Sequence, residues 1–362
     1  MTSRRVVIAP DSFKGSMTAQ QAAGAIASGW LDTRPDDAVS LFPMADGGEG
    51  TLEIVKDATP GSQVVEVGQV TGPDGAPVTS YYLALDEETA LVELAVCSGI
   101  TLMDPLNAMT ATTTGLGETI RVALDNGIRH AIIALGGSAS TDAGVGALQA
   151  LGLRALGADG EDIGHGGAHL AHITAFDTAG LLLPGQVTIL RDTNATFLDA
   201  PSMFGPQKGA TPDDVAQLED SFRQLLTVTG DTDTHLTPGA GVAGGCGWGF
   251  AHFLDANIID GASTVAELTG VSAALSEADA VITGEGKFDA TSMTGKVAGT
   301  MIALAKNSGI RVGIVAGSVD DDASHDLATV SLVEKAGDVE MALSQPGRFA
   351  KEAASQLAAQ MF

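Results

Sequence analysis

Cysteine, aromatic residues and basic residues are all scarce in this sequence. The 362 residues include two cysteines, Cys97 and Cys246, too far apart for a Cys-x-x-Cys zinc site and too few for a disulfide framework. Aromatic residues make up 4% of the chain, and 18 Lys and Arg stand against 45 Asp and Glu, for a net charge of −27. Such an acidic surface repels phosphate backbones and anionic lipids, so we expect a small-molecule ligand, and neither nucleic acid nor membrane as a partner.

Long apolar runs are also missing. No window approaches the ~18 consecutive apolar residues that a membrane helix requires. Arg4 and Arg5 are followed by only a short apolar run before Pro10, too short for the apolar region of a signal peptide. These absences predict a cytoplasmic protein. The oligomeric state cannot be read from the sequence.

The sequence does contain a regular alternation of short β-branched runs and alanine-rich helical stretches. Strands are predicted at residues 5–9, 39–43, 90–94, 130–135, 187–190, 280–283 and 312–316. Helices are predicted at residues 18–31, 50–57, 116–126, 145–151, 212–229, 263–269, 296–307 and 348–361. Thr18 and Gln21 have the spacing of a capping box at the start of the first helix. This alternation predicts an α/β fold with parallel sheets, and the length suggests two domains at about 150 residues each.

Glycine is abundant, with 46 residues, nearly twice the usual ~7%. It gathers in six segments: PDSFKGS (10–16), MADGGEGT (44–51), GGSASTDAG (136–144), GPQKG (205–209), PGAGVAGGCG (238–247), and GEGKFD (284–289) with GK (295–296). Four of them lie between a predicted strand and a predicted helix. Loops at that position can present backbone N–H groups and a helix N-terminus to an anion, although each segment alone is equally consistent with a tight turn.

The same segments concentrate charged side chains. They hold four of the eight lysines, Lys14, Lys208, Lys287 and Lys296. They also hold the carboxylates Asp11, Asp46, Glu49, Asp142, Glu285 and Asp289. Lysines beside glycines suit phosphate oxygens, and carboxylates can hold Mg²⁺ or orient a hydroxyl group. The combination favours phosphoryl transfer, while each carboxylate taken singly also fits a helix cap or a solvated loop.

Several familiar motifs are absent or incomplete. There is no P-loop, no protein-kinase signature and no Gly-x-Ser-x-Gly elbow. Residues 239–244 match Gly-x-Gly-x-x-Gly but follow no clear strand, which argues against a dinucleotide fingerprint. His165, His169 and His172 have helical spacing, but the adjacent glycines favour a solvated stripe over a metal site.

Taken together, the six segments resemble those of the glycerate kinase family, specifically the type 1 bacterial enzymes. The matching stretches are IAPDSFKGS (8–16), PMADGGEGT (43–51), LGGSA (135–139), PQKGA (206–210), PGAG with GG (238–241 and 244–245), and ITGEG with Asp289 and GK (282–286 and 295–296). They occur in the family's order and extend over nearly the whole chain.

This resemblance implies ATP-dependent, Mg²⁺-assisted phosphorylation of D-glycerate, giving 2-phosphoglycerate in most members. It also implies a Rossmann-like or flavodoxin-like parallel-sheet domain built from both chain ends, with a second α/β domain inserted. We place the first domain at residues 1–65 and 275–362 and the inserted domain at 66–274, with the active site in the cleft between them.

The resemblance also yields a set of candidate site residues. Lys14 and Lys296 are predicted to bind phosphate or the substrate carboxylate, and Asp46, Asp192 and Asp289 to hold Mg²⁺ or orient the attacking hydroxyl. These five form the catalytic set, with Asp192 and Asp289 as the metal ligands. The predicted substrate and nucleotide ligands are Asp11, Ser12, Gly15, Gly47, Gly48, Glu49, Gly136, Gly137, Ser138, Asp142, Asn194, Lys208, Gly284 and Glu285.

The chain departs from the family pattern in three places. Residues 192–197 read DTNATF where Asp-Val-x-Asn-Pro-Leu is usual, Thr141 replaces an Asn, and Thr291 replaces a Gln. The first change predicts a less rigid loop and the last a lost amide contact. Two alternatives therefore stay open: a kinase for another small hydroxy acid, and a non-catalytic protein that binds a small anion.

Overall fold

The computed structural model describes residues 3–320 and 327–362. Its contacts divide the chain into two compact units: unit 1 is Met1–Asp46 with Ala262–Phe362, and unit 2 is Gly47–Gly261. The divisions therefore fall earlier than the expected boundaries at 65/66 and 274/275. The first shift has a local cause, because the Glu93 carboxylate accepts hydrogen bonds from the N–H groups of Gly50 and Leu52 and so ties the following helix to unit 2.

Unit 1 contains a five-stranded parallel sheet. Its strands are β1 (Arg5–Ile8), β2 (Ala38–Leu41), β11 (Ala280–Thr283), β13 (Arg311–Ala316) and β15 (Ala328–Ser331), in the order β15-β13-β11-β1-β2. Ile8 pairs with Leu41 on one side and with Ile282 on the other. Because β1 and β11 are parallel neighbours, the loops that follow them leave the same edge of the sheet.

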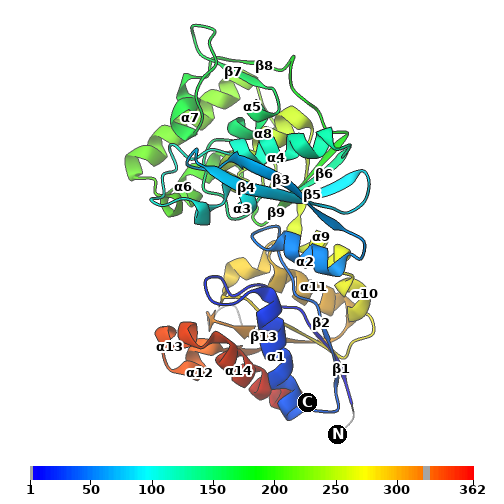
Figure 1. The fold of residues 1–362 in the computed structure, drawn as a ribbon. Coiled ribbons are helices and arrows are strands. Elements are labelled where there is room, and N and C mark those ends of the chain that lie inside the picture. Colours follow the sequence, from blue (N-terminus) through cyan, green and yellow to red (C-terminus); the bar gives the residue numbers. More distant parts are fainter. Residues whose placement is uncertain (1–2, 321–326) are drawn as a thin grey trace. The chain divides into compact units, whose positions relative to one another are not determined.

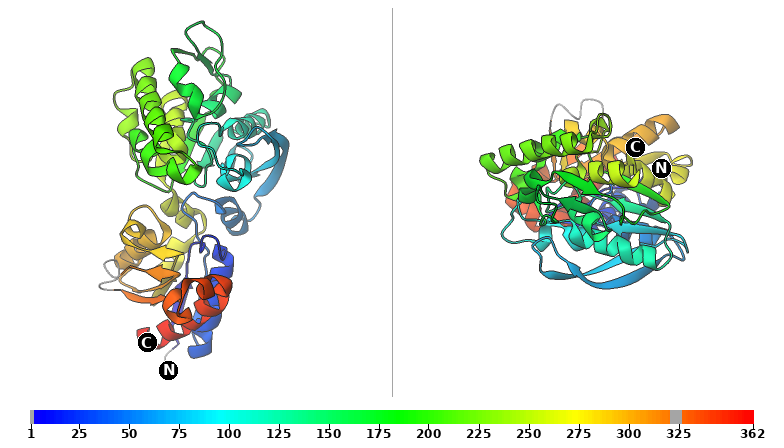
Figure 2. Two further views of the ribbon diagram at one scale, coloured as in Figure 1. Left: turned by 90° about the vertical axis from the view of Figure 1, so that its left-hand side faces the viewer. Right: turned by 90° about the horizontal axis from the view of Figure 1, so that it is seen from above.

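Helices of unit 1 pack on both faces of this sheet. Helix α1 (Ala19–Thr33) and helix α14 (Pro346–Met361) lie side by side, as Figures 1 and 2 show. Val315 packs in the same core as these two helices, whereas its neighbours Ile314 and Ala316 join a second core with α11 (Val297–Ser308). Successive strand residues point to opposite faces, so β13 contributes to both cores. The remaining elements are α9 (Gly261–Leu268), α10 (Val271–Leu275), β12 (Lys287–Phe288), η6 (Ala290–Met293), β14 (Ser318–Val319), α12 (Leu332–Ala336) and α13 (Val339–Ser344).

Unit 2 contains a six-stranded mixed sheet. Its strands are β3 (Gln63–Thr71), β4 (Pro77–Ala84), β5 (Thr89–Glu93), β6 (His130–Ala134), β9 (Gln186–Arg191) and β10 (Asn257–Asp260), in the order β10-β9-β6-β5-β4-β3. Strands β10 to β5 are parallel, and β4 and β3 form an antiparallel hairpin whose turn lies between Thr71 and Pro77. A small separate pair, β7 (Arg154–Leu156) and β8 (Ala175–Asp177), is antiparallel.

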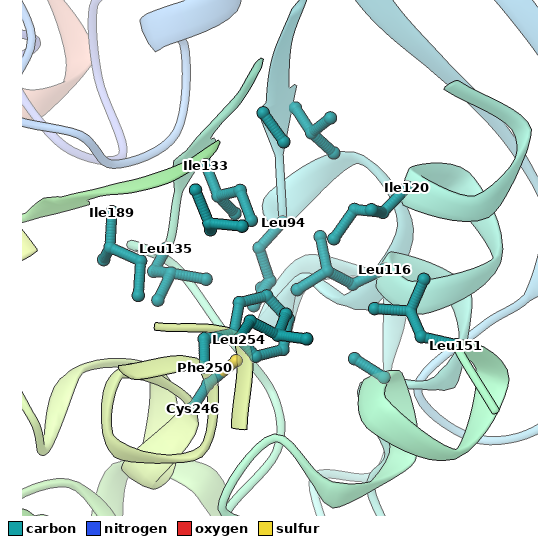
Figure 3. Packing of buried hydrophobic residues seen from close by; sticks show 14 of the residues in the cluster. Leu94, Leu116, Ile120, Ile133, Leu135, Leu151, Ile189, Cys246, Phe250 and Leu254 are labelled. Atoms are coloured by element: carbon teal, nitrogen blue, oxygen red, sulfur yellow. The ribbon is translucent and has the colours of Figure 1, made fainter. Parts of the chain in front are cut away.

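The main core of unit 2 lies between this sheet and three helices, α4 (Thr114–Asp125), α5 (Val145–Ala150) and α8 (Val242–Leu254). Figure 3 shows Cys246, Phe250 and Leu254 of α8 gathered with sheet and helix residues such as Leu94 and Leu116. Phe197, Phe222 and Trp248 stack in a second core. The other elements are α2 (Thr51–Ala58), α3 (Ala95–Ser98), η1 (Ile100–Leu102), η2 (Gly167–His172), η3 (Phe197–Asp199), α6 (Ala200–Phe204), η4 (Pro206–Lys208), α7 (Pro212–Thr229) and η5 (Thr234–Leu236).

The predicted strands and helices are all present, with ends displaced by no more than two residues. The capping box of Thr18 and Gln21 is confirmed. The predicted strands did not include β3, β4, β10 or β15. The predicted helices did not include α8, whose apolar, glycine-rich residues show no amphipathic period, or short helices such as α12. Within the described residues, no helix is both long enough and apolar enough to cross a membrane.

Candidate active site

The loop after β1 carries four of the predicted site residues. The Asp11 N–H donates to the Gly284 carbonyl (2.8 Å), which sets Asp11 beside the loop after β11. The Ser12 N–H donates to Asp11 Oδ1 (2.6 Å). Phe13 is buried and exchanges backbone hydrogen bonds with Met17, so the tight turn between them leaves Lys14 exposed and places Gly15 at a positive φ of 79°.

The loop after β11 brings a buried carboxylate to the same edge of the sheet. Glu285 is buried, and its Oε1 has no hydrogen-bond partner within the described residues. Lys296 Nζ lies 3.7 Å from Glu285 Oε2. Gly284 is required here because a Cβ would lie 1.8 Å from the Val315 carbonyl oxygen. The structure thus brings Asp11, Glu285 and Lys296 together.

Both carboxyl groups at this edge are harder to ionise than usual. Burial, with a further contribution from Glu285, raises the pKa of Asp11 to about 7, against the opposing influence of the Ser12 hydrogen bonds and Lys296. Burial also raises the pKa of Glu285, although Ser292 and Lys296 oppose this rise. A carboxyl group with a pKa near neutrality can take up and release a proton at physiological pH.

Asp289 belongs to a hydrogen-bonded chain at the start of η6. Its Oδ1 accepts from the Thr291 N–H (2.9 Å) and the Thr291 hydroxyl (2.6 Å), and its Oδ2 lies 3.3 Å from Lys287 Nζ. These contacts, with the Thr291 hydroxyl as the largest influence, lower the pKa of Asp289. Lys296 Nζ also donates to Thr291 Oγ1 (3.2 Å). Thr291, where the family pattern has Gln, therefore links Lys296 to Asp289.

In unit 2, the glycines of two loops touch at the carboxyl ends of the strands. The Gly136 N–H donates to the Gly47 carbonyl (3.0 Å). A Cβ on Gly136 would lie 2.4 Å from Gly48 Cα and 3.1 Å from Asp192 Oδ2. The structure therefore brings together Gly47, Gly48, Gly136 and Asp192. Among the other predicted residues of these loops, Asp46 and Gly137 are half-buried and Glu49 is exposed.

Three other predicted ligands lie inside unit 2. Asp142 is fully buried and accepts from the Thr113 N–H and hydroxyl (both 2.8 Å) and from the N–H groups of Gly144 and Gly146. Burial raises the pKa of Asp142, against these hydrogen bonds. Lys208 is buried and donates to Ser138 Oγ (2.7 Å) and to the Ser140 carbonyl (2.6 Å).

Asn194 is exposed, and its Oδ1 accepts a hydrogen bond from Arg191. The predicted metal ligands fall in different units, Asp192 in unit 2 and Asp289 in unit 1. Over residues 3–320 and 327–362, no group of three or more His, Cys, Asp or Glu side chains is arranged to hold a metal ion. Among the three spaced histidines, His165 Nδ1 lies 3.3 Å from Thr114 Oγ1.

Sequence reasoning overlooked two residues that shape these loops, Glu93 and Thr113, and named a third, Thr291, only as a departure from the family pattern. Glu93 accepts hydrogen bonds at the start of α2, Thr113 holds Asp142, and Thr291 joins Lys296 to Asp289. Glu93 had a detectable signal, because it is an acidic residue at the end of an otherwise apolar strand. Thr113 had none, since a single threonine in a polar loop is indistinguishable from its neighbours. The change at Thr291 predicted a lost amide contact, whereas the link from Lys296 to Asp289 is visible only in the structure.

The comparisons with known proteins address the resemblance directly. The family model described as the glycerate kinase family matches residues 6–362. The chain belongs to the glycerate kinase family. It is therefore a kinase, a phosphotransferase that acts on a hydroxyl group, and the family implies ATP as its phosphoryl donor. This confirms the resemblance and removes the non-catalytic alternative.

Individual glycerate kinase relatives align over most of their length. "Glycerate kinase" of Bacillus subtilis (strain 168) is 36% identical, covering 98% of this chain and 97% of that protein. "Glycerate 2-kinase" of Escherichia coli (strain K12) is 36% identical over 88% of this chain and 86% of its own length. The solved structure of a putative glycerate kinase 2 from Salmonella typhimurium LT2 superposes with a TM-score of 0.80 at 34% identity, covering 99% of this chain and 98% of that one. This likeness confirms the predicted α/β fold class.

Proposed function

We propose that this chain phosphorylates D-glycerate, with ATP and Mg²⁺, at the 2-hydroxyl group. The observation that carries the proposal is the family match over residues 6–362 together with relatives named glycerate kinase and glycerate 2-kinase. The contacts within the loops support it, because they combine backbone amides, exposed lysines and carboxyl groups, which phosphoryl transfer requires.

We assign the nucleotide phosphates to the glycine loops of unit 2. Gly47 and Gly136 are hydrogen-bonded to each other, and the absence of a side chain at Gly136 lets the two backbones approach within van der Waals distance. Gly48, Gly137 and Ser138 continue these loops and supply further N–H groups and a hydroxyl. Backbone N–H groups can bind phosphate without the help of a basic side chain. This matters here because the chain has few basic residues and a net charge of −27.

Mg²⁺ fits best at Asp192. This carboxylate lies beside Gly136 and Gly48, and Mg²⁺ is usually held by one or two carboxylates together with the substrate phosphates. Asp289 fits less well, because Lys287 Nζ lies 3.3 Å from its Oδ2 and places a positive charge where the cation would bind. When bound, the ion would neutralise phosphate charge, and Asp289 would keep Lys296 in place through Thr291.

We assign the acceptor side of the reaction to the loops of unit 1. Lys14 and Lys296 supply positive charge for the glycerate carboxylate or the transferred phosphoryl group. Asp11 is the best proton acceptor for the attacking hydroxyl, because its pKa of about 7 allows it to take a proton at neutral pH. Burial is the main cause of that raised pKa, Glu285 adds to it, and the Ser12 hydrogen bonds and Lys296 limit the rise.

The deciding experiment is a substrate panel with the purified chain, ATP and Mg²⁺, in which ADP release is measured. D-glycerate, L-glycerate, glycolate and D-lactate are compared at equal concentration, and we expect D-glycerate to give the highest kcat/KM. Adding enolase alone then identifies the product, because enolase dehydrates 2-phosphoglycerate directly and 3-phosphoglycerate only after a mutase has acted. If another acid is phosphorylated with a higher kcat/KM, that acid is the substrate and not D-glycerate. If enolase alone gives no signal, the phosphoryl group is transferred to the 3-hydroxyl and not to the 2-hydroxyl.

A further inference from the structure

Lys208 is a buried cation beneath a ligand-binding loop. Its side chain is 3% exposed, and its ammonium donates to Ser138 Oγ at 2.7 Å and to the Ser140 carbonyl at 2.6 Å. Burial is the main influence on its pKa and lowers it to about 8, while Asp142, Asp192 and Cys246 act in the opposite direction. A buried charge is tolerated only when it is paired and hydrogen-bonded, so these contacts stabilise the lysine as much as the loop.

The direction of the Ser138 hydrogen bond follows from the chemistry of the two groups. An ammonium group has donors and no acceptor, so Ser138 Oγ must accept from Lys208. The serine's own O–H proton then points away from Lys208 and remains available to donate. Ser138 is 6% exposed, and Gly136 and Gly137 precede it directly in the loop that we assign to the nucleotide.

The rest of this loop is also held from inside unit 2. The Ala139 N–H donates to the Ser98 carbonyl (3.0 Å), and the Ala143 N–H donates to the Gly244 carbonyl (3.0 Å). A Cβ on Gly244 would lie 2.3 Å from the Ser140 carbonyl oxygen, so the start of α8 packs directly on the loop. Lys208 joins this layer from a third segment, η4, whose following residue Gly209 has a positive φ of 87°.

We propose that Lys208 is a positioning residue that never contacts the ligand: it holds Ser138 and Ser140 from inside unit 2 and directs the Ser138 hydroxyl to donate to an anionic group, the ATP phosphates. The identity of that anion rests on the proposed function. The sequence assigned Lys208 to ligand binding because a lysine between glycines suits phosphate. Its burial gives it an indirect role instead.

A double-mutant cycle on nucleotide affinity tests this assignment. The variants are Lys208→Met, Ser138→Ala and the two combined, with exposed Lys306→Met as the matched control, and the Kd for ATP with Mg²⁺ is measured by calorimetry. Because Lys208 acts through Ser138, each single change should weaken binding about tenfold, and the double variant should lose about the same. Lys208→Arg, which keeps the charge and donors, should recover affinity to within about threefold of wild type, a rescue that simple loss of packing would not show.

If the two losses of ATP affinity are independent, they multiply to about 100-fold in the double variant. That result would overturn the proposal, because it means that Lys208 contacts the ligand itself. Wild-type affinity in Lys208→Met would overturn it as well. If wild type binds ATP but does not phosphorylate D-glycerate, the proposed function fails and the cycle still decides the role of Lys208.

A second measurement needs no variant to fold. Lysines of the wild-type chain are acetylated with an activated ester, with and without ATP, and the rate at each site is followed by mass spectrometry. We expect Lys208 to react at least about tenfold more slowly than Lys306 in both conditions, because its amine is out of solvent. Rapid labelling of Lys208 that ATP suppresses would show direct contact and overturn the proposal.

Discussion

Unit 1 and unit 2 both carry lysines next to glycines and close to carboxylates, but the two units bury their lysines differently. In unit 1, Lys14 is exposed and the Lys296 side chain is 33% exposed, so both ammonium groups can reach solvent. In unit 2, Lys208 and Asp142 are buried, and their polar atoms are hydrogen-bonded to backbone groups and to neighbouring hydroxyls.

The difference shows that residue type and loop position do not decide what a charged side chain does. A cation with access to solvent can exchange water for a ligand, whereas a buried cation has already exchanged water for protein groups and would lose them on binding anything else. We therefore expect losses in unit 1 to fall mainly on turnover, and losses among the buried groups of unit 2 to fall on stability and loop position.

Replacing Lys296 should produce the largest effect. Lys296→Ala removes a positive charge beside Glu285 and Asp11, and we expect kcat to fall about 100-fold with little change in melting temperature. ADP release in the presence of D-glycerate measures the activity, and Lys306→Ala, in the helix α11 that follows Lys296, is the matched control. A loss no greater than that of the control would contradict the role given to unit 1.

Gly136→Ala should affect both activity and stability in unit 2. The added Cβ would lie 2.4 Å from Gly48 Cα, so the two glycine loops must separate. We expect KM for ATP to rise at least about tenfold and the melting temperature to fall by several degrees. Gly24→Ala in α1 is the control, because nothing lies within 4 Å of its Cβ position and alanine favours a helix. An unchanged KM for ATP in Gly136→Ala would show that these loops do not bind the nucleotide.

Asp142→Ala tests the buried carboxylate of unit 2 against a half-buried one, Asp289 of unit 1. It leaves the Thr113 N–H and hydroxyl without their acceptor, and we expect a loss of about 3 kcal/mol in the free energy of unfolding. Asp289→Ala in unit 1 should cost no more than about 1 kcal/mol, because its lysine partner is at the surface. Denaturant titration of both variants measures the difference, and equal costs would refute the distinction between the units.

A pH dependence of stability is also expected at Asp11. Its pKa is about 7 in the folded chain against an ordinary value of 3.8, so folding takes up a proton between these values. The contribution of Asp11 to stability therefore decreases as the pH rises through this window, and Asp11→Asn removes that contribution. The melting temperature of Asp11→Asn relative to wild type should rise between about pH 5 and about pH 8. A difference independent of pH would contradict the raised pKa.

Much of the fold follows from local sequence patterns. The strands and the amphipathic helices were predictable because buried β-branched runs and apolar periodicity are encoded residue by residue. The first loop shows the limit of this reasoning. Asp11 and Glu285 are far apart in sequence, and only the pairing of β1 with β11 makes them neighbours. Burial in the folded chain raises the Asp11 pKa, and the nearby Glu285 adds to that rise.

The sequence alone determined the chemistry available to this protein: its acidity, its glycine-rich loops after strands, and motifs specific enough to indicate the family. The tertiary structure decided which of those groups meet solvent. Lys208 and Lys296 both stand next to glycine in the sequence, yet one is 3% exposed and the other has a 33% exposed side chain. Burial depends on how distant segments pack, and it sets the desolvation cost that separates a lysine able to bind a ligand from one that holds the loop in place.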